Sequence, residues 1–378
     1  RLFKVGDGVV DYQVGWPPLE ALVATVHVNN YFVRSNNAAG RIYDSSLSSG
    51  IVDVPISVLG KVDTVLVDAK GSGPFSDAIR FLKETPLAEM TSDIAAQWRG
   101  SGQVSSTIRL NLPLGARSEE ELAPDVELVI TGSTLVMPEF DLEVVNLNGT
   151  VTYNNELGLR SERFTGNSFD HPISGRIMSE ILGSGGETIV EVDGAIDMAA
   201  LYAWSDQPLL SRAEGVFTYQ AAVHVPYGGG KDETYVEAYS DLVGVTLNLP
   251  HPLEKKDPNE ARQFEYRQIF KEPGYRVELS LDDQIKASLK IENGVAVGGR
   301  IHFGEQPFGA VTYDAVRMTG HLNYLNVEDW MLLIDQLNEV SDVSLQDEIS
   351  EHVETVTLNI DELMVFSLPL IDLDAIVT

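Results

Sequence analysis

The chain has 378 residues, 43% of them hydrophobic, and carries 57 Asp and Glu against 26 Lys and Arg, a formal net charge of −31. Such a charge repels phosphate backbones and anionic headgroups, so it argues against nucleic acid as a partner and against broad electrostatic adhesion to membranes. The sequence contains no cysteine, which excludes disulfides, thiolate metal sites and cysteine nucleophiles.

The beginning of the chain lacks the signals of a membrane or secretory segment. The first seven residues, Arg1 to Asp7, contain no signal-peptide core, and no window approaches the roughly 18 consecutive apolar residues of a membrane span. We therefore expect a segment of a longer protein, whose export signal or anchor lies outside this sequence.

Three short amphipathic helices are predicted in chain order, near residues 76–85, 197–205 and 327–338. Pro86 and Pro208 end the first two, because proline lacks an amide donor and clashes with the preceding turn. The third opens at Asn326 and places Trp330, Leu333, Ile334 and Leu337 along one stripe. After each of the first two helices a glycine starts a strand that runs to a proline, which indicates a repeated β-meander with a short helix.

Most of the remaining sequence alternates between apolar and polar residues with period two, which is typical of half-buried strands. Short turn signals such as Asp282-Asp283 favour antiparallel meanders over parallel crossovers. The sequence thus predicts a mainly β protein. The apolar positions that we assign to one sheet face are Val145, Leu147, Val151, Tyr153, Phe217, Tyr219, Val223, Val277, Leu279, Ile285, Leu289, Val297, Ile301 and Phe303.

Catalytic and metal-binding motifs are missing from the sequence. The seven histidines form no close ligand pair, and His224 and His302 are interpreted as surface residues on polar strand faces. The run Gly228-Gly229-Gly230-Lys231-Asp232 has aspartate where a phosphate loop has Ser or Thr, so we interpret it as a hairpin or flexible loop. We expect no catalytic residue, no metal and no cofactor. Paired carboxylates leave a carbohydrate-active enzyme as an alternative.

Several segments resemble one known family when they are taken in order. They are Gly15-Trp16-Pro17-Pro18-Leu19, the helix that ends Phe81-Leu82-Lys83-Glu84-Thr85-Pro86-Leu87, the loop Leu249-Pro250-His251-Pro252-Leu253-Glu254-Lys255, and Gly320 to Trp330. Together they resemble the YhdP branch of the AsmA-like proteins, which are large bacterial envelope proteins. The likeness runs across nearly the whole chain and is weakest at residues 117–124 and 255–273.

The resemblance implies a long twisted antiparallel sheet, curved into an open hydrophobic groove that carries phospholipid. We accordingly expect groove repeat units over residues 1–195 and 196–378 in a continuous elongated module, with the apolar positions above as the lipid-binding face. The implied setting is the periplasm of a Gram-negative bacterium, within an inner-membrane-anchored protein whose partners are acyl chains and membrane proteins at its ends. The residues alone leave open whether the sheet forms a groove or a closed sandwich, and a structural or assembly scaffold of the envelope remains an alternative.

Overall fold

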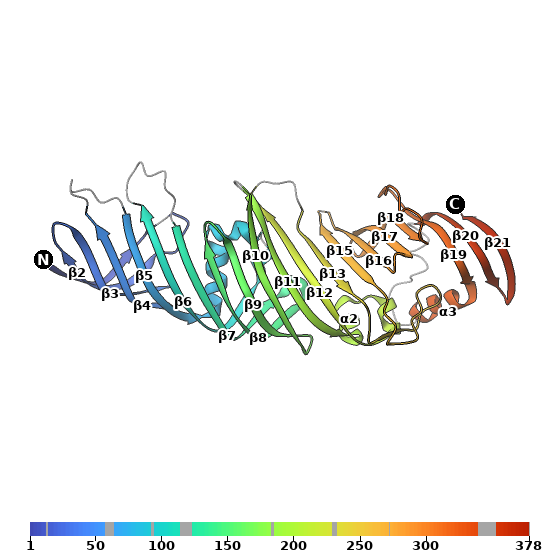
Figure 1. Ribbon diagram of the computed structural model, residues 1–378, viewed down its shortest axis with the longest axis horizontal. Coiled ribbons are helices and arrows are strands. Elements are labelled where there is room, and N and C mark those ends of the chain that lie inside the picture. The colour runs from blue at the N-terminus through green and yellow to red at the C-terminus, as the bar shows by residue number, and fades with distance from the viewer. Residues whose placement is uncertain are drawn as a thin grey trace. The chain divides into compact units, whose positions relative to one another are not determined.

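The computed structural model describes residues 1–12, 14–56, 64–91, 94–113, 123–182, 185–228, 233–271, 273–338 and 353–377. Over these residues the protein is mainly β, with 21 strands and three α-helices (Figure 1). Two compact units are present. Unit 1 comprises Arg1–Val192 and His224–Asp232, and unit 2 comprises Asp193–Val223 and Glu233–Thr378. The predicted mainly β fold class, an open curved sheet with a few short helices, is confirmed.

Unit 1 is an antiparallel meander in which each strand from β1 to β10 pairs with the next along the chain. Antiparallel neighbours can be joined by short turns, as at residues 43–44, whereas residues 75–98 join the fifth strand to the sixth. The strands are β1 (Leu2–Val10), β2 (Leu19–Val28), β3 (Phe32–Ile42), β4 (Ser45–Pro55), β5 (Thr64–Pro74), β6 (Arg99–Pro113), β7 (Ala123–Met137), β8 (Leu142–Asn154), β9 (Gly158–Ser168) and β10 (His171–Leu182).

The helices lie where the sequence places them. They are α1 (Phe75–Glu84), α2 (Met198–Ser205) and α3 (Val327–Asn338). The side chain of Asp197 caps α2 by accepting a hydrogen bond from the Ala199 amide at 2.7 Å, and Asn326 accepts one from the Glu328 amide at the start of α3. After α1 and α2, Pro86 and Pro208 each open a 3-10 segment, η1 (Pro86–Thr91) and η4 (Pro208–Arg212).

The same order of elements therefore occurs twice. β5, α1, η1, η2 (Ile94–Gln97) and β6 are matched by β11 (Gly185–Asp197), α2, η4 and β12 (Ala213–Tyr227). In both cases the strand after the helix has a glycine with positive φ near its start, Gly102 at 107° and Gly215 at 112°. A side chain would be strained at either position, and an added Cβ would also meet an adjacent strand, at Ser133 and Gly244 respectively.

Unit 2 is a mixed sheet. β11 and β12 contain residues of both units. β12 pairs with β14, and β13, β15, β16, β17 and β18 form an antiparallel series. The strands are β13 (Tyr235–Ser240), β14 (Val245–Leu247), β15 (Phe264–Phe270), β16 (Tyr275–Leu281), β17 (Ile285–Glu292), β18 (Val295–Phe303), β19 (Val316–Asn326), β20 (Val353–Val365) and β21 (Leu368–Val377).

Two parallel pairings correct the expectation of meanders alone. β18 pairs in parallel with β19, and β19 in parallel with β20, before β21 returns antiparallel. Parallel neighbours need a crossover connection. The first crossover is residues 304–315, and the second contains α3.

The first crossover also explains why the surface assignment of His302 is wrong. His302 is 6% exposed. Its Nδ1 lies 3.1 Å from the Thr319 hydroxyl, and the Phe308 ring packs edge-on against it. The Arg300 guanidinium holds the crossover by donating to the Phe308 carbonyl at 2.8 Å. The polar strand face that carries His302 is thus covered by residues 304–315, the segment that follows the strand, and alternation within the strand does not reveal this contact. Residues 229–232 of the glycine-rich run lie outside the described residues.

Candidate functional site

The strand register of unit 1 aligns one apolar face across successive strands. Residues that pair across neighbouring strands point to the same side of a sheet. One such row crosses six strands from β1 to β6, and all of its members except one serine are apolar. The row is Phe3, Val26, Ser35, Val52, Val67 and Leu110. Parallel to it, Ala69, Ile108, Val126, Tyr153 and Leu159 form a second row over β5 to β9. We call this surface the unit 1 apolar face.

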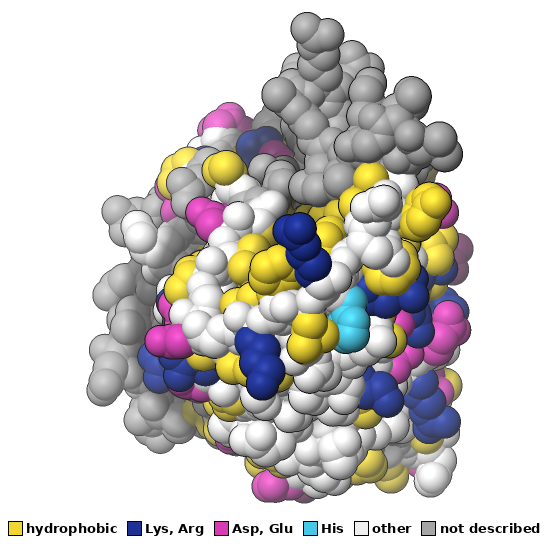
Figure 2. Space-filling model, turned by 90° about the vertical axis from the view of Figure 1, so that its left-hand side faces the viewer, with side chains coloured by type: hydrophobic (Ala, Val, Ile, Leu, Met, Phe, Trp, Pro, Cys, Tyr) yellow, Lys and Arg dark blue, Asp and Glu magenta, His cyan; other side chains and the backbone are white. Residues whose placement is uncertain are grey.

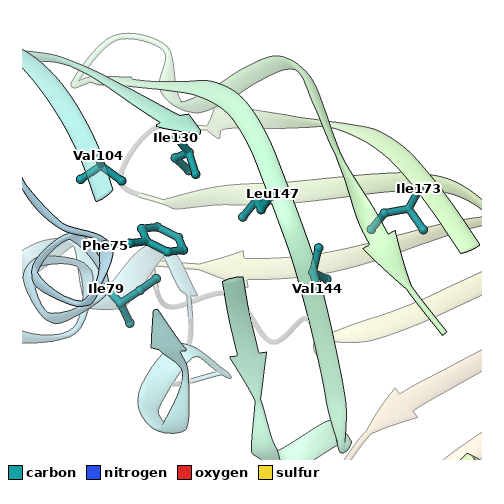
Figure 3. Close-up of a cluster of buried hydrophobic side chains, with 7 residues drawn as sticks. All are labelled: Phe75, Ile79, Val104, Ile130, Val144, Leu147 and Ile173. Atoms are coloured by element: carbon teal, nitrogen blue, oxygen red, sulfur yellow. The ribbon is translucent and has the colours of Figure 1, made fainter. Parts of the chain in front are cut away.

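Helix α1 covers one end of the unit 1 apolar face. Phe75 and Ile79 of the helix pack on Val104, Ile130 and Leu147 of the sheet (Figure 3). Val144 and Ile173 complete this buried cluster. The close approach requires Gly100, because a Cβ there would lie 2.9 Å from the Phe75 ring.

Buried polar contacts fix the position of α1. The Asp77 carboxylate, 8% exposed, accepts hydrogen bonds from the Ser45 hydroxyl at 2.7 Å and from the Asp44 amide at 3.0 Å. Tyr43 donates to Glu84 at 3.0 Å, and burial together with this hydrogen bond raises the pKa of Tyr43 to about 12. The turn between β3 and β4 thereby clamps the helix over this end of the face.

Beyond α1 the same face is only half-buried. Val67, Ile108, Leu110, Val126 and Tyr153 all keep part of their surface exposed. Figure 2 shows hydrophobic side chains gathered in the middle of the surface at the end of the molecule where the chain starts, with cationic side chains beside them. A half-buried apolar strip that crosses many strands provides a surface along which an apolar chain can lie.

The opposite face of unit 1 carries ion pairs between strands. Arg34 pairs with Asp53, Arg109 with Asp125 at 3.3 Å, and Arg176 with Glu191. Exposed pairs of this kind add little stability, but they keep this side of the sheet hydrated. Exposed Ile51 and Leu66 lie on this side as well, so this face combines charged and apolar side chains.

The structure shifts one predicted residue off the unit 1 apolar face. Leu147 is buried in the α1 cluster, and Val151 and Tyr153 lie on the face as the alternation predicts. Val145 is 40% exposed, whereas its neighbour Val144 is 7% exposed in the cluster. The reason is a bulge between Val145 and Asn148, where Asn146 has a φ of 50° and reverses the alternation.

The register of unit 2 aligns most of the predicted positions there. Leu279 pairs with Ala287 and Ala287 with Ile301, Val277 pairs with Leu289, and Ile285 pairs with Phe303. Six of the seven predicted positions from β16 to β18 thus share one side. The row through Leu279 extends to Tyr266 on one side and to Met318 and Val356 on the other. We call this surface the unit 2 apolar face. Val297 falls in a bulge between the pairs at Ala296 and Gly298, so its side does not follow from the register.

The three predicted positions on β12 alternate with polar residues. Phe217 is 8% exposed, and Tyr219 and Val223 are half-buried. Burial raises the pKa of Tyr219. The intervening Gln220 donates from its side chain to Asp193 at 3.0 Å, as expected for the polar side of the strand.

In unit 2, helix α3 packs beside the loop that follows β14. Leu333 and Leu337 of α3 are buried, and Trp330 donates its indole N–H to the His251 carbonyl at 3.1 Å. Lys255, 1% exposed, donates to the Val245 and Asp257 carbonyls. Nearby, Arg262 pairs with Asp282 at 2.5 Å. These contacts show that the lysine of the Leu249–Lys255 loop, which the sequence singles out as a motif, has an internal structural role.

Among the described residues, no three His, Asp or Glu side chains lie close enough together to hold a metal ion. Within the same residues, no helix is long and apolar enough to cross a membrane.

The two units define a class of mainly β protein in which the strands of each unit align apolar residues on one side of the sheet. The chain belongs to the YhdP family, because the model of that family, described as YhdP protein, matches residues 2–377. No curated protein and no solved structure matches the chain. Family membership is consistent with lipid transport and with a non-catalytic role.

Proposed function

We propose that this chain is a passive conduit segment that carries phospholipid between the inner and outer membranes across the periplasm. The observation that carries the proposal is the alignment of apolar residues over successive strands, half-buried beyond α1, with ion pairs between strands on the opposite face. In this proposal the acyl chains lie on the apolar faces, and the headgroup stays in solvent.

The energetic reason is the cost of exposing acyl chains to water. Each buried CH₂ is worth about 0.8 kcal/mol, so two chains of ordinary length cost on the order of 20 kcal/mol to hydrate. A continuous apolar surface removes most of this barrier. Because the surface repeats from strand to strand and offers no deep enclosed site, a lipid can slide along it.

The proposal assigns lipid contact to the predicted positions that are half-buried, which are Val151, Tyr153, Tyr219, Val223, Val277, Leu279, Leu289, Val297, Ile301 and Phe303. Leu147, Phe217 and Ile285 are buried and support the face from within, and Val145 leaves the set because it lies on the other side of the sheet. In the same proposal the groove repeats extend over residues 1–195 and 196–378, the segment lies in the periplasm of a Gram-negative bacterium, and membrane proteins meet the ends of the full-length chain. No enzymatic step is part of this function.

Native mass spectrometry of the chain purified from bacteria without detergent tests the proposal. The expected spectrum contains protein ions with added masses of phospholipids, which solvent extraction then identifies. A spectrum of lipid-free protein under these conditions would contradict the conduit and favour an envelope scaffold. Bound oligosaccharide in place of lipid would favour a carbohydrate-active protein.

A further inference from the structure

One polar side chain interrupts the unit 2 apolar face. Gln268 of β15 pairs with Val277 on one side and with Val236 on the other, and Val277 in turn pairs with Leu289. Its carboxamide therefore belongs to a row of apolar side chains. The side chain is half-buried, so a ligand that covers it on this face must satisfy its hydrogen-bonding groups to avoid a cost in free energy.

The orientation of this carboxamide is fixed by a neighbour on the same strand. Tyr266, two residues earlier and on the same side, donates its hydroxyl hydrogen to Gln268 Oε1 at 2.7 Å. Burial and the nearby Tyr275 raise the pKa of Tyr266 to about 12, so this hydroxyl remains a donor at every physiological pH. This hydrogen bond uses the amide oxygen of Gln268, so the amide NH₂ group is the part of the side chain that can donate to a ligand.

That NH₂ group has no hydrogen-bond partner among the residues that the structure describes. Its two N–H bonds are donors with no acceptor capacity. The ligand that suits it therefore has an apolar body for the surrounding valine and leucine side chains and an uncharged oxygen acceptor near one end of that body.

We infer that Gln268 is a docking point for the ester carbonyl of an acyl lipid lying on the unit 2 apolar face, with Tyr266 as its positioning residue. The inference rests on the proposed function and adds to it a preference for one lipid chemistry. An ester-linked acyl chain carries a carbonyl acceptor where its hydrocarbon begins, whereas an ether-linked alkyl chain of the same length lacks it. One hydrogen bond of this kind corresponds to a preference of about threefold to tenfold.

The test compares two zwitterionic lipids with the whole 378-residue chain. Diacyl phosphatidylcholine and its dialkyl ether analogue of equal chain length compete with a fluorescent phospholipid for the protein. The ratio of their affinities isolates the carbonyl, because the headgroup, the chain length and the protein fold are common to both measurements. We expect the wild-type protein to favour the ester lipid by about threefold to tenfold.

Four variants test whether the preference for the ester lipid depends on the amide group of Gln268. Gln268→Leu removes the donor and is expected to bring the ratio close to one. Gln268→Glu, whose carboxylate accepts but does not donate, is expected to abolish or reverse the preference. Tyr266→Phe leaves the amide free to rotate and is expected to lower the ratio while ester and ether lipids still bind. Gln263→Leu, an identical change at an exposed glutamine just before β15, is expected to keep the wild-type ratio.

A wild-type ratio of one, or a preference that survives Gln268→Leu, would overturn the inference and leave the proposed function standing. Failure of both lipids to bind the wild-type protein would remove the proposed function, and the inference with it.

Discussion

A charged residue at Leu279 distinguishes an open apolar face from a sealed core. Leu279 lies in the middle of the unit 2 apolar face, between Tyr266 and Ala287 of the adjacent strands, and is half-buried. Full burial of a leucine side chain is worth about 1.5 to 3 kcal/mol, so its loss at a half-buried position costs about 1 to 2 kcal/mol. The carboxylate of Leu279→Asp keeps access to water, so it adds little to this cost.

Ile360 of β20 provides the matched control, because it faces the same side and is 2% exposed. Ile360→Asp loses a fully buried side chain and leaves an unpaired buried charge, a cost of several kcal/mol that approaches the roughly 5 to 15 kcal/mol stability of an ordinary domain. By thermal denaturation, Leu279→Asp is expected to lower the melting temperature by about 2 to 8 °C, from 2 to 4 °C per kcal/mol. Ile360→Asp is expected to prevent folding.

The assay pairs stability with lipid transfer between donor and acceptor vesicles, or with envelope integrity in cells that produce the full-length protein. A charge on the path of the acyl chains is expected to abolish transfer while the protein stays folded. If Leu279→Asp unfolds as Ile360→Asp does, the face is a sealed core. If the variant folds and transfers lipid normally, Leu279 does not lie on the lipid path.

Three further perturbations test the packing. Leu333→Ala is expected to lower the free energy of unfolding by about 2 to 4 kcal/mol. Leu332→Ala is the control, because this side chain is 58% exposed on the same helix, and it is expected to change the free energy of unfolding by only a few tenths of a kcal/mol. Equal effects of the two substitutions in chemical denaturation would refute the docking of α3. Asp77→Ala is expected to destabilise the protein by about 1 to 3 kcal/mol, because it leaves the Asp44 amide and the Ser45 hydroxyl without their acceptor. Ser76→Ala, at an exposed position of the same helix, is the control. If Asp77→Ala leaves the unfolding midpoint unchanged, these hydrogen bonds do not hold α1 in place. The pKa of Tyr266 is about 12 in the folded chain against 10.0 for an ordinary tyrosine. Its contribution to stability is therefore complete below pH 10 and is lost as the pH rises from 10 to 12. Tyr266→Phe should make this loss of stability with pH shallower, and an ultraviolet titration in which Tyr266 ionises near pH 10 would contradict its burial.

Local patterns in the sequence predict much of the fold. The helices follow from proline stops, caps and apolar stripes, and the alternation between β16 and β18 places six of the seven predicted residues on one side. These features depend on contacts within a few residues along the chain, which sequence patterns report directly.

Features that depend on distant segments or on single backbone irregularities were not predicted. The bulge at Asn146 places Val144, and not Val145, on the side of the apolar face, because one residue with positive φ reverses the alternation of a strand. The burial of His302 and the parallel pairing of β19 depend on a crossover whose position no local pattern encodes. The row from Phe3 to Leu110 in unit 1 was also missed as a site, although alternation around Val67 was a usable signal. Its continuity is set by the register between strands.

Photo-crosslinking tests the central claim, that acyl chains lie along the apolar face of each unit, most directly. A phospholipid with a diazirine in its acyl chain is bound to the chain and illuminated, and mass spectrometry locates the modified residues. The account predicts modification of alternate residues on successive strands, at Val67, Leu110, Val277 and Leu279, while Asp68 and Glu278 on the opposite side stay unmodified. Equal modification of both sides of these strands, or modification confined to a single spot, would contradict it.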